Sequence, residues 1–305
     1  MSAVTDPPAI RQRRPLSRVA RRWLAGLAGI LALGLLWELY KLLGPVDGLE
    51  LFDARVLPRT TDRAMPHVWD MFARLGEPVT GASTALPLWL EVAKSALMTL
   101  GIAAVGWVIG VAVGMGFALL MQRFRLAEWS ILPWIVVSQT VPLIAFAPLV
   151  RSWGAKIEIG AFEWQGWMSV AVIASYLSFF PVAIGALRGL GAPDTIHVEL
   201  MRSYAAGWWA TLVRLRLPAS VPYLLPALRL AAANAVIGAV VAEVSTGLQG
   251  GIGRILIQYA GQASGDPAKA WGPIFGSIAL GLVAAGSVAL LGGALGRYRR
   301  TEVNA

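Results

Sequence analysis

The stretch ELMRSYAAGWWATLVRLRLPAS, residues Glu199–Ser220, places three arginines between two long apolar segments. It belongs to a connection that runs over residues 188–221, whereas about two to eight residues would be enough to join two neighbouring helices. Crossing a membrane therefore does not require this segment. The length and basic character of the connection predict a structured element outside the apolar segments.

The order of residue types inside the stretch predicts two short helices. Residues Glu199–Tyr204 are compatible with a first helix, and Ala205-Ala206-Gly207 can supply a bend. The run Trp208–Leu217 then predicts a second helix that ends at Pro218, because proline lacks a backbone donor and disrupts a helix interior. We expect a compact helical hairpin.

The composition of the whole chain indicates a membrane protein with several spans. Of its 305 residues, 57% are apolar and 14% are charged, whereas soluble domains carry about 25% charged residues. Several apolar runs approach the ~20 residues that cross a bilayer. The absence of cysteine excludes disulfides, thiol nucleophiles and thiolate metal sites. The net charge is +9, and the basic residues cluster mostly in short loops beside apolar runs. This distribution indicates how the chain is oriented in the membrane and argues against a nucleic-acid partner.

Six spans are predicted. Their ranges are Trp23–Leu43, Val92–Met121, Ile131–Trp153, Trp167–Leu187, Leu224–Val244 and Ile274–Leu295. The third is expected to break at Pro142 and Pro148, and the fourth contains Pro181. A signal peptide, or a twin-arginine signal at residues 21–22, is the alternative for the first run. Its length favours an uncleaved span.

The distribution of basic residues predicts cytoplasmic N- and C-termini. With that orientation the segments 1–22, 122–130, 188–221 and 297–305 carry 15 basic and five acidic residues. The opposite segments 44–90, 154–166 and 247–270 carry seven basic and nine acidic residues. Cytoplasmic loops are enriched in Lys and Arg, so the quoted stretch is placed in the cytoplasm.

The predicted organisation has five parts. They are a basic N-terminus at 1–22, the first span at 23–43, a periplasmic segment at 44–90, a five-span core at 91–296 with the cytoplasmic loop 188–221, and a tail at 297–305. The periplasmic segment contains AMPHVWDMFARLGE, whose apolar spacing predicts a short amphipathic helix resting on the membrane or on the span ends, in preference to a substrate-binding element.

The quoted stretch resembles the cytoplasmic "EAA" loop of ABC importer permeases. That pattern has Glu-Ala-Ala, three residues, Gly, nine residues, an aliphatic residue, one more residue and Leu-Pro. Glu199 stands at the Glu position, Leu215 at the aliphatic position and Leu217-Pro218 at the Leu-Pro, with no insertion. The chain departs from the pattern at Leu200-Met201, which replace Ala-Ala, and at Ala205, which stands where Gly is expected.

Two further segments resemble permeases for nitrate, alkanesulfonates, taurine and thiamine or riboflavin precursors. They are SQTVPLIAFAPLVRSWG at Ser138–Gly154 and VVAEVSTGLQGGIGRILIQ at Val240–Gln258. The resemblance covers about residues 85–296 and implies an all-α membrane protein with six transmembrane helices, the type I ABC importer permease fold and a cytoplasmic coupling helix. The third-span QTVP favours vitamin precursors or similar heterocycles as the solute.

The resemblance also implies the partners. A second permease copy, two ABC ATPase subunits and a periplasmic or lipid-anchored substrate-binding protein would complete the transporter, with ATP and Mg bound by the ATPase and no cofactor in this chain. The expected ATPase-coupling residues are Glu199, Leu200, Met201, Arg202, Tyr204, Ala205, Gly207, Leu217 and Pro218. The alternative interpretation is an amphipathic hairpin on the inner leaflet, with its arginines on anionic lipid.

Four residues in or near the spans are candidates for the translocation pathway or its gate. They are Gln139, Pro142, Asn234 and Glu243. An intramembrane carboxylate usually faces a bundle interior or a cavity, so Glu243 either lines the pathway or makes a structural hydrogen bond at the span end. Helix-joining hydrogen bonds are the preferred interpretation for Gln139 and Asn234, and ordinary kinks for the prolines.

Glycines in two places have a structural interpretation. Gly106, Gly110 and Gly114 recur every four residues and predict a close helix contact inside the chain, with a dimer seam as the less favoured use. The glycines of Leu248–Gly253, LQGGIG, follow no soluble strand, so a nucleotide site is not expected there.

Two other classes of function compete with the permease. None of the lysines follows the glycine spacing of a phosphate loop, so the energy for transport is expected from another polypeptide. A secondary, ion-coupled transporter would be expected to show paired intramembrane charges or an inverted repeat. A membrane-embedded enzyme would need a catalytic constellation that the sequence does not offer. We therefore expect a non-enzymatic permease subunit.

Overall fold

The computed structural model describes residues 18–51, 54–82 and 84–294. The chain forms two compact units, which divide between Asp70 and Met71.

The first unit contains one long helix and a small hairpin. Helix α1 (Arg18–Leu43) includes the predicted first span, and its Leu24–Leu43 portion is long and apolar enough to cross a membrane. Strands β1 (Leu49–Leu51) and β2 (Ala54–Leu57) pair antiparallel. Lys41 near the end of α1 forms an ion pair with Asp62, with 2.7 Å between Nζ and Oδ1.

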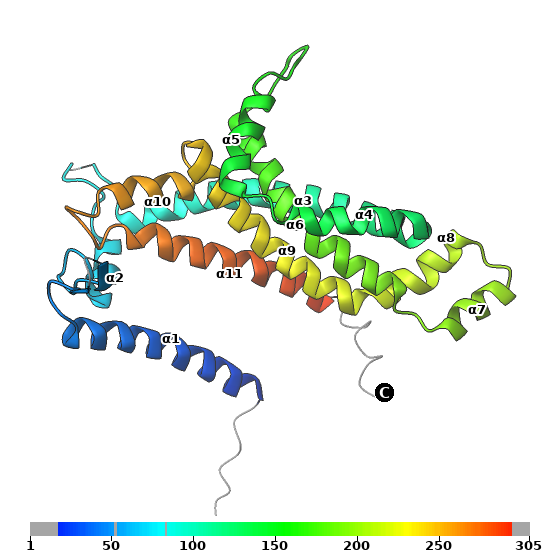
Figure 1. The fold of residues 1–305 in the computed structure, drawn as a ribbon, viewed down its shortest axis with the longest axis horizontal. Helices are drawn as coiled ribbons and strands as arrows, with labels where there is room; N and C mark the ends of the chain where they lie inside the picture. The colour runs from blue at the N-terminus through cyan, green and yellow to red at the C-terminus, as the bar shows by residue number, and fades with distance from the viewer. Residues whose placement is uncertain (1–17, 52–53, 83, 295–305) are drawn as a thin grey trace, which may run out of the picture. The chain divides into compact units, whose positions relative to one another are not determined.

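The second unit is a helical bundle (Figure 1). Its first helix begins at the end of the first unit. The helices are α2 (Val68–Gly76), α3 (Leu88–Arg123), α4 (Arg125–Ser138), α5 (Leu143–Gly154), α6 (Gly166–Gly191), α7 (Thr195–Ser203), α8 (Trp208–Thr211), the π-helix η1 (Leu212–Arg216), α9 (Leu217–Thr246), α10 (Ile252–Gly261) and α11 (Trp271–Ala294). Between α5 and α6, strands β3 (Glu158–Ile159) and β4 (Phe162–Glu163) form a second small antiparallel hairpin.

Helices α3, α6 and α9 form the centre of the bundle, and α6 lies between the other two. Small residues permit this close packing. A Cβ added at Gly106 would lie 2.8 Å from the carbonyl oxygen of Ala171 in α6, and one added at Gly114 would lie 2.6 Å from that of Phe179. The glycine repeat is thus an internal helix contact, as preferred from the sequence.

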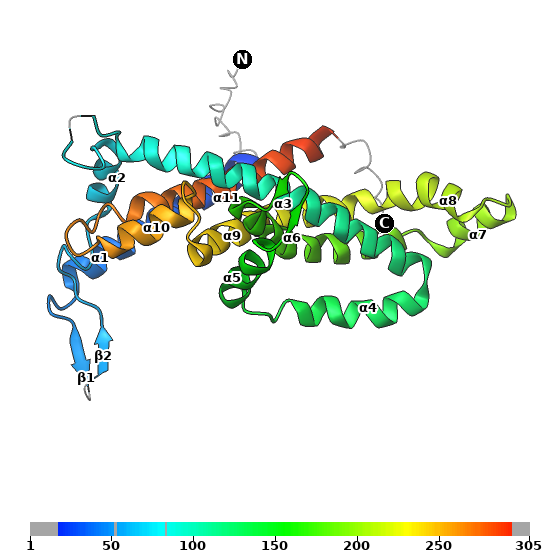
Figure 2. The same cartoon turned by 90° about the horizontal axis from the view of Figure 1, so that it is seen from above.

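The third predicted span is a sharply bent pair of helices. Helices α4 and α5 meet at 104°, and the turn between them contains Gln139 and Pro142 (Figure 2). Pro142 is the residue that precedes α5. The expected break at Pro148 is wrong, because Pro148 lies inside α5. Pro148 is the sixth of the twelve residues of α5 and removes one hydrogen bond, to the carbonyl of Ile144, without ending the helix.

The prediction that Pro218 ends a helix is also wrong. Helix α8 continues through η1 into α9, and this helical run extends from Trp208 to Thr246. The π-helix directly before Pro218 widens the turn by one residue per hydrogen bond. The proline ring therefore avoids the carbonyl that it would meet in a regular α-helix.

Within the described residues, five helices are long and apolar enough to cross a membrane, or six spans if the bent pair counts as one. They coincide with the six predicted apolar segments, and α2 is the predicted amphipathic helix. Phe72 of α2 stacks on Phe275 at 4.9 Å, so this helix rests on the end of α11. The helix α10 and the two β-hairpins were not predicted.

Candidate functional site

Helix α7 and the start of α8 protrude from one end of the bundle (Figure 1). No residue of α7 is buried. The side chain of Glu199 is exposed and has no hydrogen bond or ion pair with any described residue. Leu200 is 52% exposed and Tyr204 is 79% exposed. This face is therefore free to contact another molecule.

The bend after α7 is a complete Schellman motif. The amide of Ala206 donates to the carbonyl of Met201 at 2.9 Å, and the amide of Ala205 donates to that of Arg202 at 2.9 Å. This pair of hydrogen bonds closes a helix whose next residue is left-handed. Ala205 has φ 53°, and it is the single described residue other than glycine with a positive φ. The position at which the resemblance expects glycine is thus the left-handed position of the turn.

The far side of the hairpin is anchored to the bundle. Trp208 Nε1 donates to Gln122 Oε1 at 3.2 Å, and the guanidinium of Arg123 lies 5.3 Å from the centre of the Trp208 ring. Arg216 Nη1 donates to the carbonyl of Leu190 at the end of α6, at 2.8 Å. Leu212 of η1 is buried among residues of α3 and α6. A force on α7 would be transmitted through these contacts and the continuous helix into α9.

Several large apolar side chains of the hairpin are exposed, and we call these residues, together with Glu199 and Arg202, the hairpin face. Its large apolar members are exposed by 52% to 79%, a pattern expected for a surface that a partner covers. They are Ile196, Leu200, Tyr204, Trp209 and Val213. Glu199 and Arg202 add charges of both signs and are exposed as well. A groove on a partner protein could bury the apolar residues and pair the charges.

At the opposite end of the bundle, Glu243 of α9 is fully buried, and its carboxylate accepts a hydrogen bond from a backbone amide in the first turn of α10. Glu243 Oε2 accepts from the amide of Gly253 at 2.9 Å. Thr99 Oγ1 of α3 lies 2.8 Å from Glu243 Oε1 and accepts from the amide of Ile252 at 2.9 Å. The first turn of a helix has amides without partners inside the helix, and the residue before α10, Gly251, has no side chain to cap them.

The glycines of LQGGIG make room for this carboxylate. A Cβ at Gly253 would lie 2.6 Å from the carbonyl of Val240, and one at Gly251 would overlap the Glu243 carboxylate. Gly250 has φ 89°, a conformation open to glycine and costly for other residues. The glycines therefore serve a tight connection between α9 and α10.

Comparisons with known proteins agree with this architecture. The family model described as "Binding-protein-dependent transport system inner membrane component" matches residues 85–297. The chain belongs to this family. It is a permease, and the match contains the five-span core and the hairpin.

Relatives of the permease are named as permease proteins of transport systems. The formylaminopyrimidine transport permease protein ThiX of Halalkalibacterium halodurans is 30% identical over 67% of this chain and 77% of the relative. The putative aliphatic sulfonates transport permease protein SsuC of Bacillus subtilis is 25% identical over 83% and 79%. A crystal structure of an amino acid ABC transporter with histidines superposes with a TM-score of 0.50 at 19% identity, covering 69% of this chain and 94% of that chain.

These findings establish a multi-pass inner-membrane permease subunit of an ABC importer with the type I permease fold. The family implies an ATPase and a substrate-binding protein as partners. The alternative of an ion-coupled secondary transporter finds no support in the family or in these relatives.

The permease does not gather its four predicted pathway residues into one site. Glu243 has the structural contacts described above. Asn234 Nδ2 donates to the carbonyl of Leu177 at 3.4 Å and so joins α9 to α6. Gln139 Nε2 donates to the hydroxyl of the neighbouring Ser138 at 3.4 Å, in the turn that also contains the exposed Pro142. Their role in a pathway stays a prediction.

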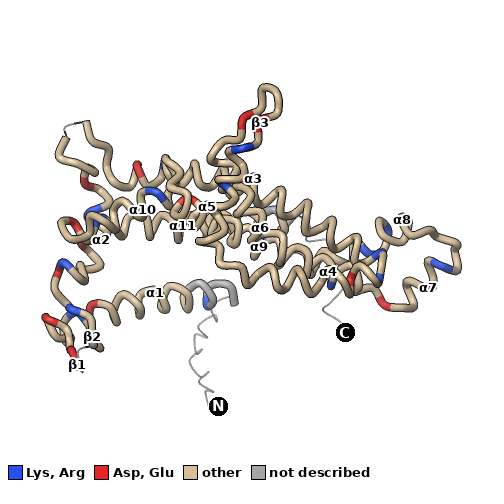
Figure 3. The backbone as a smooth tube through the Cα atoms, turned by 45° about the horizontal axis from the view of Figure 1, so that its top comes forward, with Lys and Arg blue, Asp and Glu red and all other residues tan. Residues whose placement is uncertain are grey.

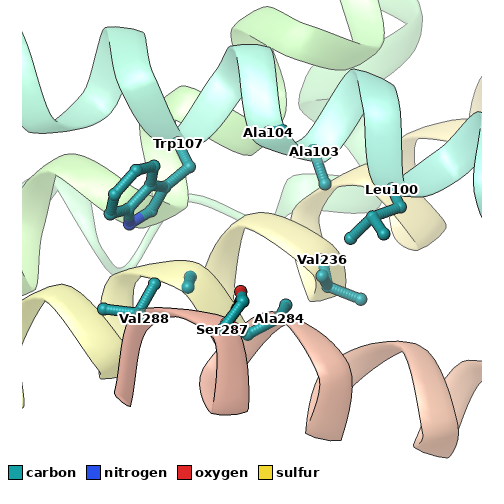
Figure 4. A pocket seen from close by; sticks show the side chains of 9 residues that line it. Leu100, Ala103, Ala104, Trp107, Val236, Ala284, Ser287 and Val288 are labelled. Carbon is teal, nitrogen blue, oxygen red and sulfur yellow. Dashed lines mark hydrogen bonds between the residues drawn. The ribbon is translucent and has the colours of Figure 1, made fainter. Parts of the chain in front are cut away.

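A small apolar cavity of about 160 Å³ lies between α3, α9 and α11 (Figure 4). Leu100, Trp107 and Val236 line it with Val288 and alanines, and Ser287 contributes a hydroxyl. Trp107 Nε1 donates to the carbonyl of Leu228 at 3.2 Å, which fixes the ring at the cavity wall.

One charged residue of the fifth span, Arg229, was not predicted as a site residue. Arg229 lies inside α9, its Nε is buried, and it has no hydrogen-bond partner among the described residues. A Cβ at Gly292 of α11 would lie 3.6 Å from Arg229 Nη2, so the side chain extends toward α11. A single basic residue within the run Leu224–Val244 was the available signal.

Proposed function

We propose that the hairpin face of this permease is the docking element for the ATPase subunit, and that the N- and C-termini lie on the same, cytoplasmic side. The proposal rests above all on one observation: α7 has no buried residue, while α8 and η1 are fixed to the ends of α3 and α6. An element that is free on one side and fixed on the other can pass motion from a partner to the bundle.

The mechanism that follows is alternating access powered by the partner. ATP and Mg bind the ATPase, whose closure moves α7. The continuous helix from Trp208 to Thr246 carries this motion into the centre of the bundle. A two-state bundle responds to whichever state the partner favours. Two permease copies would face each other around the pathway, and a substrate-binding protein would deliver the solute on the side of α10.

For the solute we propose a small heterocycle. The support is that ThiX is named for formylaminopyrimidine transport and another relative, RibX of Chloroflexus aurantiacus, for riboflavin transport. Competition uptake assays with a labelled pyrimidine test this. Stronger competition by an alkanesulfonate than by unlabelled pyrimidine contradicts the proposal.

The docking proposal is tested by crosslinking, because the chain has no cysteine. Ser203 is exposed at the end of α7, and Ser264 is exposed after α10 at the other end of the bundle. We expect Ser203→Cys to crosslink to the ATPase in membranes, with a yield that changes when ATP is added. We expect Ser264→Cys to be labelled by a membrane-impermeant reagent from outside. The reverse labelling pattern would overturn the orientation, and an equal crosslinking yield at both positions would overturn the docking site.

A further inference from the structure

A hollow of about 1120 Å³ lies where the ends of α3 and α6 approach the beginnings of α4 and α9. It is lined by four arginines from four different segments of the chain and by a single acidic residue. The arginines are Arg123, Arg125, Arg188 and Arg216, and the acid is Glu128. Lys and Arg gather at this end of the bundle near α8 and the start of α4 (Figure 3).

No carboxylate of the described residues forms an ion pair with these arginines. Arg123 and Arg125 lie over the rings of Trp208 and Trp129, each at 5.3 Å. Arg216 uses one nitrogen for the carbonyl of Leu190. A guanidinium has five N–H donors, so most of the donors around the hollow remain available for an anion.

The hollow continues into an apolar groove between α4 and α6. Leu132 and Val136 of α4 line one side, and Phe180 and Ile184 of α6 line the other. Arginines match phosphate groups in geometry and charge. A ligand that fits both parts has a phosphate at one end and a hydrocarbon chain at the other.

We propose that this hollow binds the phosphate group of an anionic phospholipid, whose acyl chain lies in the groove between α4 and α6. Basic pockets between transmembrane helices on the cytoplasmic side are suited to such headgroups. The preference for basic residues in cytoplasmic loops accounts for arginines at this end of the bundle. That preference does not explain why four arginines line one hollow beside an apolar groove.

The test uses the full-length chain, purified and delipidated in detergent, and native mass spectrometry with added phosphatidylglycerol or phosphatidylcholine of the same acyl chains. The variant is Arg125→Gln/Arg188→Gln. The matched control is Arg214→Gln, because Arg214 is exposed on η1 and does not line the hollow. Inorganic phosphate, added in a third arm, distinguishes a lipid headgroup from a free anion.

We expect the wild-type chain to prefer phosphatidylglycerol, and the double variant to bind it at least about tenfold more weakly, since each basic residue near a membrane surface contributes severalfold in affinity. We expect Arg214→Gln to change the affinity by less than about twofold. Equal binding of the two lipids, or an equal loss in Arg214→Gln, would overturn the proposal. Displacement of the lipid by millimolar inorganic phosphate would show a free-anion site and would overturn the lipid assignment. None of these results depends on the ATPase, so the docking proposal stands or falls separately.

Discussion

At the scale of single residues, Ala205 shows how a local departure from a pattern acquires a structural meaning. The sequence identifies the expected glycine position and the alanine that occupies it. The structure shows why glycine suits that position, since the residue is left-handed and closes a Schellman motif. An alanine in this conformation costs about 1–2 kcal/mol because its Cβ approaches the following carbonyl.

We predict that Ala205→Gly stabilises the end of α7 by about 0.5–1 kcal/mol, because relief of the left-handed strain exceeds the added chain entropy of glycine. Hydrogen exchange at the amides of residues 205 and 206, both bonded within the motif, measures this directly. The expected result is slower exchange.

The matched control is Ala206→Gly, whose φ is not positive. There glycine adds entropy to the unfolded chain without relieving strain, so we expect faster exchange. If both variants exchange faster than the wild type, the left-handed alanine is not the source of strain that we infer.

Glu243 marks the limit of what sequence reasoning could achieve for single residues. Its place in an apolar run indicates a buried carboxylate with a partner, and that is what the structure shows. Its partners were not predictable, because Thr99 lies on α3 and Gly253 lies on α10, a helix that the sequence did not lead us to expect. These hydrogen bonds lie at the end of the span, and the role of Glu243 in the pathway stays a prediction.

At the scale of elements, the long apolar helices were predictable because twenty consecutive apolar residues have few other structures available. The short elements were harder. The sequence of α10 contains glycines next to Arg254 and Gln258, and turn residues precede it. The helical spacing of its apolar residues was therefore difficult to recognise. The continuity across Pro218 depends on a π-helix, for which no residue pattern in this stretch gives a signal.

The contact between α3 and α6 gives a prediction at the same scale. Gly110 of α3 faces Ser175 and Ser178 of α6, and a Cβ there would lie 2.8 Å from the Ser175 carbonyl and overlap the Ser178 hydroxyl. We expect Gly110→Ala to destabilise the bundle by about 1–3 kcal/mol, because a packed helix contact has no room for a methyl group. Thermal unfolding in detergent measures the effect.

Gly116 is the control, since it lies on the same helix and a Cβ there meets nothing within 4 Å. Gly116→Ala should leave the midpoint unchanged or raise it slightly, because alanine has the higher helix propensity. Equal destabilisation by both variants would show that the α3–α6 contact is looser than the structure indicates.

At the scale of the whole molecule, the sequence predicts the order of the parts and the resemblance predicts their roles. It does not predict how the parts are joined. The anchors of the hairpin, Trp208 on Gln122 and Arg216 on Leu190, connect segments 86 and 26 residues apart and become visible only in three dimensions. For the proposed docking role these anchors are important, because a free loop would absorb a push from a partner, whereas an anchored hairpin would pass it to the bundle.

Separation of a free face from an anchored face leads to a prediction about coupling. Glu199 lies on the free face and has no partner in the described chain, whereas Glu243 is buried and hydrogen-bonded. We expect Glu199→Ala to insert and unfold like the wild type but to lose most solute uptake, while ATP hydrolysis by the assembled transporter continues.

We expect Glu243→Ala to lose uptake through instability, with a lower unfolding midpoint, since a buried amide loses its acceptor at a cost of about 1–3 kcal/mol. Uptake in proteoliposomes, ATP hydrolysis and thermal unfolding together separate the two cases. Normal uptake in Glu199→Ala, or a fall in its unfolding midpoint equal to that of Glu243→Ala, would contradict the role of the hairpin face as the point where the ATPase drives this bundle.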